Sequence, residues 1–278
     1  MDQGKVLIRL ALFGRPIKSS LSPSIHRMFA DQLGLTIDYQ SIETGPEGFP
    51  GALETFRLAG GVGCNVTLPL KRDAWQMAAE SSPQVAQAQA ANTLVAQPSG
   101  WFAHNTDGTG LLTDLNTNHA INFLDKRILV LGAGGATAGI LGGLLAGSPR
   151  QVVLVNRNLE RAETLSGRFH ANGKLAVVTW AGLSVQGSFE LVINATSLGH
   201  QGQVPPLQQS VFAPRAVCYD LNYYKASEPL RAWCEALGQR YIDGLGMLVE
   251  QAAESFHIWT GKHPDSRAVI EKFRKEAH

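Results

Sequence analysis

The sequence predicts an α/β protein with two α/β domains, the second of them with a Rossmann-type dinucleotide-binding fold. Short apolar segments alternate with helix-like segments along most of the 278 residues. Four apolar residues at 128–131 lead directly into a glycine cluster at 132–136, and a helical pattern of small and apolar residues follows. A polar stretch at 116–122 separates this second α/β series from the first and is a candidate domain boundary.

The first α/β series is expected to form a parallel sheet with helices between its strands. Its expected strands are residues 7–13, 37–42, 61–66 and 93–96. Ser22 looks like an N-cap with Pro23 at the first helical position, and Gly34 ends the helix that they begin. Further helices are expected at 49–58, after Pro69 and at 83–91.

A helix that begins near Asp107 is expected to link the two series. The expected strands of the second series are residues 128–131, 152–155, 175–178, 191–193 and 217–220. Its expected helices are residues 135–146, 159–169 and 229–237, followed by a short segment at 241–242, a longer helix at 247–259 and a last helix after Pro264. This alternation again favours parallel strands joined by helices.

The composition excludes several classes of function. The 24 Lys and Arg residues nearly balance the 23 Asp and Glu residues, so the net charge of +1 gives no footprint for nucleic acid or an anionic membrane. The three cysteines are far apart and lack metal-ligand spacing, and the histidines lack it too, so we expect reduced thiols and no metal site. There is no signal peptide and no apolar run near the roughly 20 residues that span a bilayer, which favours a cytoplasmic protein.

The glycine cluster predicts where a dinucleotide binds. Gly132 would permit a tight turn after the strand, and Gly134 would allow a pyrophosphate to approach the backbone at the start of a helix. Thr137 occupies the position of the third glycine in the full fingerprint, so the pattern is incomplete. The alternative at this point is a strand, turn and helix that bind nothing.

The end of the next strand predicts NADP rather than NAD. NAD-binding folds place an acidic residue about 20 residues after the fingerprint, against the ribose 2′-hydroxyl. Here Asn156 and Arg157 occupy that region, and Arg161 follows one turn later. Two guanidinium groups can clamp a 2′-phosphate that a carboxylate would repel. The alternative is that both arginines belong to a solvated helix face.

Three other polar segments contain candidate functional side chains. Residues 65–71 bring an amide, a hydroxyl and the amine of Lys71, residues 104–108 bring the carboxylate of Asp107, and residues 194–199 form a small polar turn. Nothing in the spacing alone pairs Lys71 with Asp107. By default, Ser20 and Ser22 are an N-cap and its neighbour.

Together, these segments resemble the shikimate dehydrogenase family. The resemblance rests on the order of residues 20–23, 65–71, 92–93, 105–108, 132–136, 156–157, 194–199 and 243–248, and it extends from about residue 13 to residue 259. It implies two α/β domains with the active site in the cleft between them. Residues 1–106, completed by C-terminal helices at 247–278, would bind the substrate, and residues 107–246 would bind NADP.

The resemblance also implies a reaction and the residues that carry it. The reaction is the reversible, NADP-dependent reduction of 3-dehydroshikimate to shikimate, by a monomer or homodimer. The implied catalytic pair is Lys71 for proton transfer and Asp107 as its partner. The implied substrate-binding residues are Ser20, Ser22, Thr67, Asn92, Tyr223 and Gln251. The implied NADP-binding residues are Gly132, Ala133, Gly134, Gly135, Ala136, Asn156, Arg157, Arg161 and Thr196, with Leu221 and Gly244 near the nicotinamide.

Three alternatives remain open at this point. A quinate/shikimate dehydrogenase that also uses NAD would need space near Ser20, Ser22 and Tyr223. The absence of an acidic residue at Asn156 and Arg157 argues against it. A catalytically silent NADP sensor on the same fold would have no need for both Lys71 and Asp107. A methylene-tetrahydrofolate-type dehydrogenase would leave the two serines unexplained.

Overall fold

The computed structural model describes residues 6–169 and 173–276. The chain divides into two compact units, Met1–Gly110 with Val249–His278, and Leu111–Leu248. The chain passes from one unit to the other inside two helices, α5 (Asp107–Thr113) and α9 (Leu245–Thr260). The polar stretch at 116–122 lies within the second unit, where its first residues belong to a π-helical turn, Asp114–Asn118.

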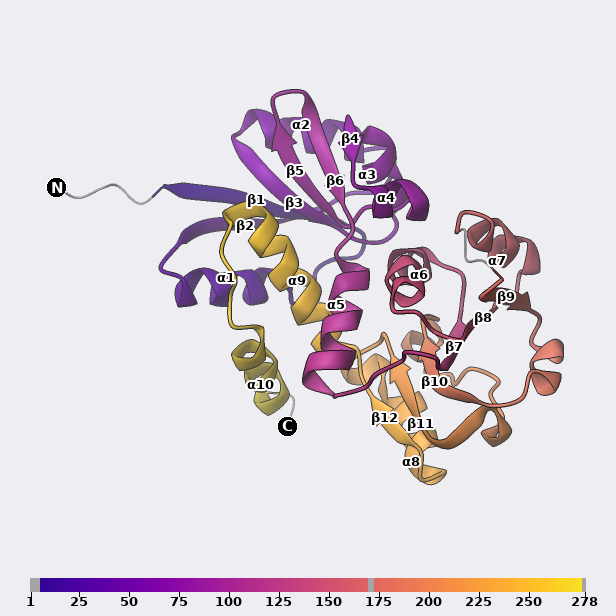
Figure 1. Ribbon diagram of the computed structural model, residues 1–278. Helices are drawn as coiled ribbons and strands as arrows, with labels where there is room; N and C mark the ends of the chain where they lie inside the picture. The colour runs from indigo at the N-terminus through magenta and orange to yellow at the C-terminus, as the bar shows by residue number, and fades with distance from the viewer. Residues whose placement is uncertain (1–5, 170–172, 277–278) are drawn as a thin grey trace. The chain divides into compact units, whose positions relative to one another are not determined.

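The first unit contains a six-stranded sheet of order β2-β1-β3-β5-β6-β4 (Figure 1). Its strands are β1 (Leu7–Gly14), β2 (Thr36–Glu43), β3 (Gly61–Val66), β4 (Glu80–Ser81), β5 (Thr93–Gln97) and β6 (Gly100–His104). β1 pairs in parallel with β2 and β3, as expected, whereas β5 is antiparallel to both of its neighbours. Two residues join β5 to β6, and so short a connection permits only antiparallel pairing.

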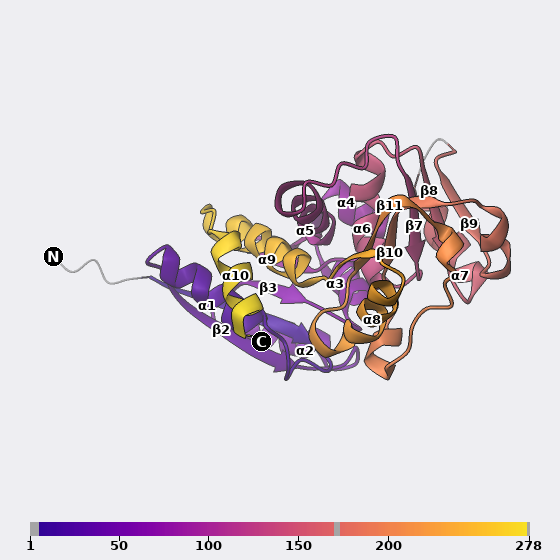
Figure 2. The same ribbon diagram turned by 90° about the horizontal axis from the view of Figure 1, so that it is seen from below.

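Helices cover both faces of this sheet (Figures 1 and 2). They are α1 (Ser22–Gln32), α2 (Phe49–Leu58), α3 (Lys71–Met77), α4 (Pro83–Ala88), α9 and α10 (Ser266–Glu276). The alternating side chains of β1 separate the two apolar layers. Phe13 packs with Phe49 and Phe56 of α2, whereas Leu10 and Leu12 belong to a cluster on the opposite face, against which Trp259 of α9 packs.

The second unit has a six-stranded parallel sheet of order β12-β11-β10-β7-β8-β9. Its elements are β7 (Arg127–Leu131), α6 (Gly135–Ala146), β8 (Gln151–Val155), α7 (Leu159–Ser166), β9 (Leu175–Val178), β10 (Phe189–Asn194), β11 (Phe212–Asp220), α8 (Glu228–Ala236) and β12 (Arg240–Ile242). The strand order reverses between β7 and β10, and this is the order of a Rossmann fold. Ligands of such sheets bind at the carboxyl ends of the strands at this reversal, so the glycine cluster after β7 occupies the ligand-binding position.

The predicted elements and the observed ones agree in order, with several differences. The helix predicted at 83–91 ends at Ala88, and the strand predicted at 217–220 begins at Phe212. The strands β4 and β6 had not been predicted. Ser22 is not an N-cap, because Leu21 occupies that position and α1 has no side-chain cap. The helix predicted at 159–169 ends at Ser166, and Gly167 is its C-cap residue.

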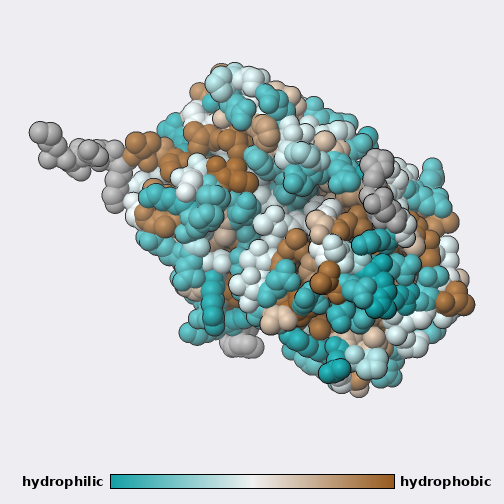
Figure 3. Space-filling view, in the orientation of Figure 1, coloured by the Kyte–Doolittle hydropathy of each residue, from teal (hydrophilic) through white to brown (hydrophobic). Residues whose placement is uncertain are grey.

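On the face shown in Figure 3, hydrophobic side chains form small groups among hydrophilic ones. The exposed large hydrophobic residues of the described chain include Val6, Leu58 and Val185, which lie in different elements or loops. Across residues 6–169 and 173–276, no helix combines the length and the apolar character that crossing a membrane requires.

Candidate active site

Lys71 and Asp107 form an ion pair in the first unit. The Nζ of Lys71 donates to Oδ2 of Asp107 at 2.5 Å, and their side chains are 14% and 7% exposed. Each stands at the first position of a helix, Lys71 of α3 and Asp107 of α5. The structure thus brings together two residues that spacing alone could not pair.

Asn92 and Gln251 complete the surroundings of this pair. The Nδ2 of Asn92 donates to Oδ1 of Asp107 at 2.9 Å and to Oε1 of Gln251 at 3.1 Å. Asn92 is buried immediately before β5, whereas Gln251 is half-buried on α9. The carboxylate of Asp107 therefore receives an ammonium on one oxygen and an amide on the other.

The two predicted serines lie together at the start of α1. Ser20 Oγ donates to Ser22 Oγ at 3.2 Å, and the side chain of Ser22 lies near the hydroxyl of Tyr39. Thr67, just after β3, is half-buried, and its backbone N–H donates to Phe13 O. Ser22 thus faces a buried hydroxyl instead of capping its helix.

Four buried polar residues of the first unit escaped the sequence-based prediction of the site. They are Asn65, Thr93, Thr106 and Ser255, each at most 6% exposed. They bond to one another and to Asn92, for example Ser255 Oγ to Thr93 Oγ1 at 2.8 Å and Asn92 Nδ2 to Thr106 Oγ1 at 2.8 Å. Asn65 and Thr106 stand inside segments that the sequence marked, but Ser255 gives no signal in an apolar helical pattern.

The glycine turn of the second unit has the geometry that a phosphate-binding loop requires. Gly132 has φ of +100°, and a Cβ there would lie 3.1 Å from Ala195 O, so a side chain would be strained. A Cβ at Gly134 would have only Arg161 Nη2 within 4 Å, at 3.9 Å, and Gly134 caps α6 without a side-chain bond. Thr137, in place of a third glycine, donates to Gly132 O at 2.8 Å and fixes the turn.

Of the predicted residues after β8, Arg161 contacts this turn. Arg161 Nε donates to Ala133 O at 2.9 Å, which places its guanidinium beside the glycine turn. Arg157 is exposed, and Asn156 Nδ2 donates to Asn158 O at 2.8 Å. Gly135 and Ala136 form the first turn of α6 and are half-buried. The structure therefore brings Arg161 to the turn and leaves Arg157 in solvent.

The loops after β10 and β11 share one buried carboxylate, Asp220. Its Oδ1 accepts from Asn194 Nδ2 at 2.9 Å and from Asn222 N at 3.0 Å. Asn194 in turn accepts the hydroxyl of Thr196 at 2.7 Å. Burial raises the pKa of the Asp220 carboxyl to about 6.

Leu221 and Gly244 lie side by side. A Cβ at Gly244 would stand 2.4 Å from Leu221 O, so only glycine permits this approach. Tyr223, two residues further along, is half-buried beside the ring of Tyr224, and burial raises the pKa of its hydroxyl. Leu221, Gly244 and Tyr223 belong to the second unit, as do all predicted cofactor residues.

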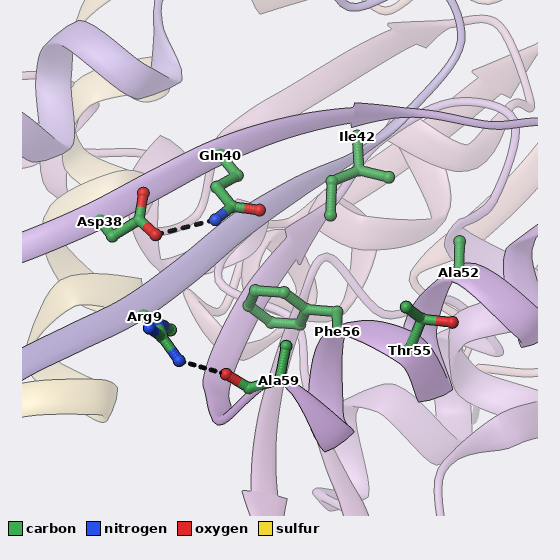
Figure 4. A pocket seen from close by; sticks show the side chains of 8 residues that line it. All are labelled: Arg9, Asp38, Gln40, Ile42, Ala52, Thr55, Phe56 and Ala59. Carbon is green, nitrogen blue, oxygen red and sulfur yellow. Dashed lines mark hydrogen bonds between the residues drawn. The ribbon is translucent and has the colours of Figure 1, made fainter.

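A separate pocket of about 490 Å³ lies on the first unit, beside α2 (Figure 4). Strands β1 and β2 supply Arg9, Asp38 and Gln40, and Phe56 lies among the residues that α2 contributes. Arg9 donates to the carbonyl of Ala59, and Gln40 donates to Asp38. None of the predicted site residues lines this pocket.

The fold and these geometries define a class: an α/β protein of two units, one of which is a Rossmann-type dinucleotide-binding unit. Three family models match the chain. They are the shikimate dehydrogenase substrate binding domain over residues 12–94, shikimate / quinate 5-dehydrogenase over residues 114–201, and the shikimate 5′-dehydrogenase C-terminal domain over residues 244–272.

Known proteins agree with these matches along nearly the whole chain. A shikimate dehydrogenase (NADP(+)) of Alkalilimnicola ehrlichii is 46% identical over 96% of this chain and 99% of its own. The crystal structure of an Ael1 enzyme from Pseudomonas putida superposes with a TM-score of 0.88 at 37% identity, over 95% of this chain and 97% of its own. Shikimate 5-dehydrogenase from Thermus thermophilus, in complex with NADP(H) and shikimate, gives 0.83 at 31% identity, over 98% and 100%. The chain belongs to the shikimate dehydrogenase family.

Proposed function

We propose that this chain catalyses the NADP-dependent, reversible reduction of 3-dehydroshikimate to shikimate, as an enzyme of aromatic amino-acid biosynthesis. The observation that carries the proposal is the Lys71–Asp107 pair at 2.5 Å, in a chain 46% identical to a shikimate dehydrogenase (NADP(+)). We propose that residues 1–106 with 247–278 bind shikimate and that residues 107–246 bind NADP. A cytoplasmic location and a monomeric or homodimeric state remain predictions.

The second unit fits NADP in three respects. The open approach at Gly134 and the uncapped start of α6 suit a pyrophosphate, because backbone N–H groups there have no side-chain acceptor. Arg161, beside Ala133, and the exposed Arg157 suit a 2′-phosphate. The carbonyl of Leu221 beside Gly244 offers an acceptor for a carboxamide.

Bound NADPH supplies the hydride, and the residues of the first unit handle the proton. As hydride reaches the ketone carbon of the substrate, negative charge develops on its oxygen. The ammonium of Lys71 stabilises that charge and donates the proton. Asp107 holds Lys71 and accepts a hydrogen bond from a substrate hydroxyl, while Asn92 keeps the carboxylate in place.

The polar groups of the first unit suit a hydroxylated carboxylic acid. Serine and threonine hydroxyls can each donate and accept, so Ser20, Ser22 and Thr67 can bind a carboxylate. Gln251 and Asn92 offer amides that can bind ring hydroxyls. The alternative substrate, quinate, carries an additional hydroxyl at the carbon that bears the carboxylate, and we propose shikimate as the preferred substrate.

A product assay tests the proposal. The purified chain is incubated with NADPH and 3-dehydroshikimate, and the products are identified by NMR. We expect shikimate and NADP⁺ in equal amounts. Binding of NADPH without any turnover would instead favour the NADP sensor. In a parallel incubation with NADP⁺, oxidation of quinate at the rate of shikimate would favour the broader dehydrogenase.

A further inference from the structure

A continuous buried network of hydrogen bonds leads from Tyr39, which lies near Ser22, to the Lys71–Asp107 pair. It runs from Tyr39 to Asn65, to Thr93 and to Asn92, which donates to Asp107. Tyr39 and Thr93 are 9% and 0% exposed, so neither can contribute appreciably to a ligand surface. The proposed reaction assigns these inner residues no role.

The amide of Asn65 has one permitted orientation. Its Oδ1 accepts the hydroxyl of Tyr39 at 2.9 Å and lies 2.9 Å from Nε2 of His26. Its Nδ2 faces Asn92 O, Thr93 Oγ1 and Ser255 Oγ, at 3.3, 3.3 and 3.1 Å. A flipped amide would set its oxygen against the Asn92 carbonyl, which can only accept.

His26 supports this orientation. Its ring is fully buried and stacks on Tyr39 with centroids 4.6 Å apart. Burial lowers the pKa of His26 to about 3, so the ring is neutral at physiological pH. A neutral ring that faces the Asn65 oxygen must carry its proton on Nε2, and Nδ1 has no partner among the described residues.

Asn92 is held in the same way. Its Oδ1 accepts from the backbone N–H of Thr106 at 2.8 Å and from the hydroxyl of Thr93 at 2.9 Å. This leaves Nδ2 to face Oδ1 of Asp107 at 2.9 Å. The donors thus point in one direction, from Tyr39 and His26 towards the Asp107 carboxylate, and hydrogen bonds aligned in this way strengthen one another.

We propose that Tyr39, Asn65 and Thr93 are positioning residues that hold Asn92 and Asp107 in their working orientation and couple them to Ser22. The inference rests on the proposed function, because it requires Asp107 and Ser22 to meet the substrate. It also explains why the interior strands β3 and β5 and the edge strand β2 contain buried amide and hydroxyl groups, at positions that apolar side chains could fill equally well.

The test removes single hydroxyls without changing side-chain shape. Thr93→Val and Tyr39→Phe each delete one link, Thr93→Ser restores the hydroxyl, and Thr260→Val is the matched control. Thr260 also lies in the first unit, but its hydroxyl bonds to Phe256 O and Lys262 N, outside the network. Steady-state kinetics with shikimate and NADP⁺, thermal unfolding and ¹⁵N NMR of His26 are measured for each variant.

We expect Thr93→Val and Tyr39→Phe each to lower kcat about 5- to 20-fold, with the KM for NADP⁺ within about twofold of wild type. Thr93→Ser should recover most of kcat, and the Tyr39→Phe/Thr93→Val double variant should lose less than the product of the single losses. Thr260→Val should keep wild-type kcat even where its unfolding temperature falls.

Three kinetic results would overturn the proposal. They are unchanged kcat in both single variants, no recovery by Thr93→Ser, and multiplicative losses in the double variant. The NMR measurement is independent of activity: a proton on Nδ1 of His26 would reverse the Asn65 amide and refute the network. If the wild type failed to oxidise shikimate, the proposed function would fall, and the His26 tautomer would still decide whether the network exists as described.

Discussion

The ammonium of Lys71 lies 2.5 Å from the carboxylate of Asp107, and both stand at the first position of a helix. The position favours the carboxylate, because the N-terminus of a helix carries partial positive charge, and disfavours the ammonium. The contact with Asp107 offsets this cost for Lys71. The stability of its own helix therefore does not explain the position of Lys71, whereas its contact with Asp107 does.

Replacing Lys71 with alanine should remove the proton donor and the charge that stabilises the alkoxide. We expect Lys71→Ala to lower kcat by a factor of about 10² to 10⁴, while the KM for shikimate changes by less than about threefold. Steady-state kinetics check this, with Lys272→Ala as the control, since Lys272 is an exposed residue of α10. A Lys71→Ala enzyme with near-wild-type kcat would remove Lys71 from the mechanism.

Asp107→Asn should damage both turnover and binding. The amide keeps the shape of the carboxylate but lacks the charge that holds the ammonium of Lys71. One of its two orientations would also set its NH₂ group against the Nδ2 donor of Asn92. We expect kcat to fall about 10- to 100-fold and the KM for shikimate to rise several-fold. Calorimetric titration with shikimate separates the two effects. If KM stayed constant, Asp107 would act on Lys71 alone.

Arg157→Ala should weaken the binding of NADP⁺ but not that of NAD⁺. Arg157 is exposed, so its removal should leave stability unchanged, whereas Arg161 also supports the glycine turn through Ala133 O. We expect the KM for NADP⁺ to rise about 10-fold and kcat/KM with NAD⁺ to change less than about twofold. Arg150→Ala, which removes an exposed guanidinium bonded to Asp125, is the control. An equal loss with both cofactors would contradict the assignment of Arg157 to the 2′-phosphate.

Asp220 should make stability depend on pH. Its folded pKa of about 6 exceeds the ordinary value of 3.8, so between these values the folded state binds a proton that the unfolded state has lost. Stability therefore falls as pH rises through this window, by up to about 1.4 kcal/mol per pH unit. Asp220→Asn removes the titration, so the variant should gain stability relative to wild type as pH rises from about 4 to 6.

Urea unfolding at several pH values measures this difference. Asp125→Asn is the control with the opposite sign, because Arg150 lowers the pKa of the exposed Asp125 carboxyl. Its stabilising contribution is present at neutral pH and disappears as pH falls, and it should be small because the pair is exposed. If the Asp220→Asn difference did not change with pH, the carboxyl would titrate equally in both states.

The regular elements were predictable because each carries its own local signal. The bounds of α2, β3, α6 and β9 agree with those expected from apolar periodicity and glycine or proline boundaries. The strand β6 escaped because its alternation is short and begins at Gly100. The prediction of Ser22 as an N-cap is wrong because Leu21 occupies that position, and the hydroxyl of Ser22 accepts from Ser20 and lies near Tyr39, far away in sequence.

The candidate site was predictable only for residues that lie within a recognisable sequence motif or a segment of the family resemblance. Gly132 and Gly134 follow from the strand, turn and helix pattern, and the family resemblance supplied Lys71 and Asp107. Ser255 and Tyr39 were out of reach because their contacts join residues 162 or 26 positions apart, such as Ser255 with Thr93 and Tyr39 with Asn65. Periodicity predicts which face such residues occupy, but not which polar partner they meet.

The most direct measurement of the central claim is kcat/KM for shikimate and for quinate, each with NADP⁺ and with NAD⁺. The account predicts the highest kcat/KM for shikimate with NADP⁺. This value should be at least about 10-fold above that for quinate with NADP⁺ and that for shikimate with NAD⁺. Comparable values with NAD⁺, or a preference for quinate, would contradict it.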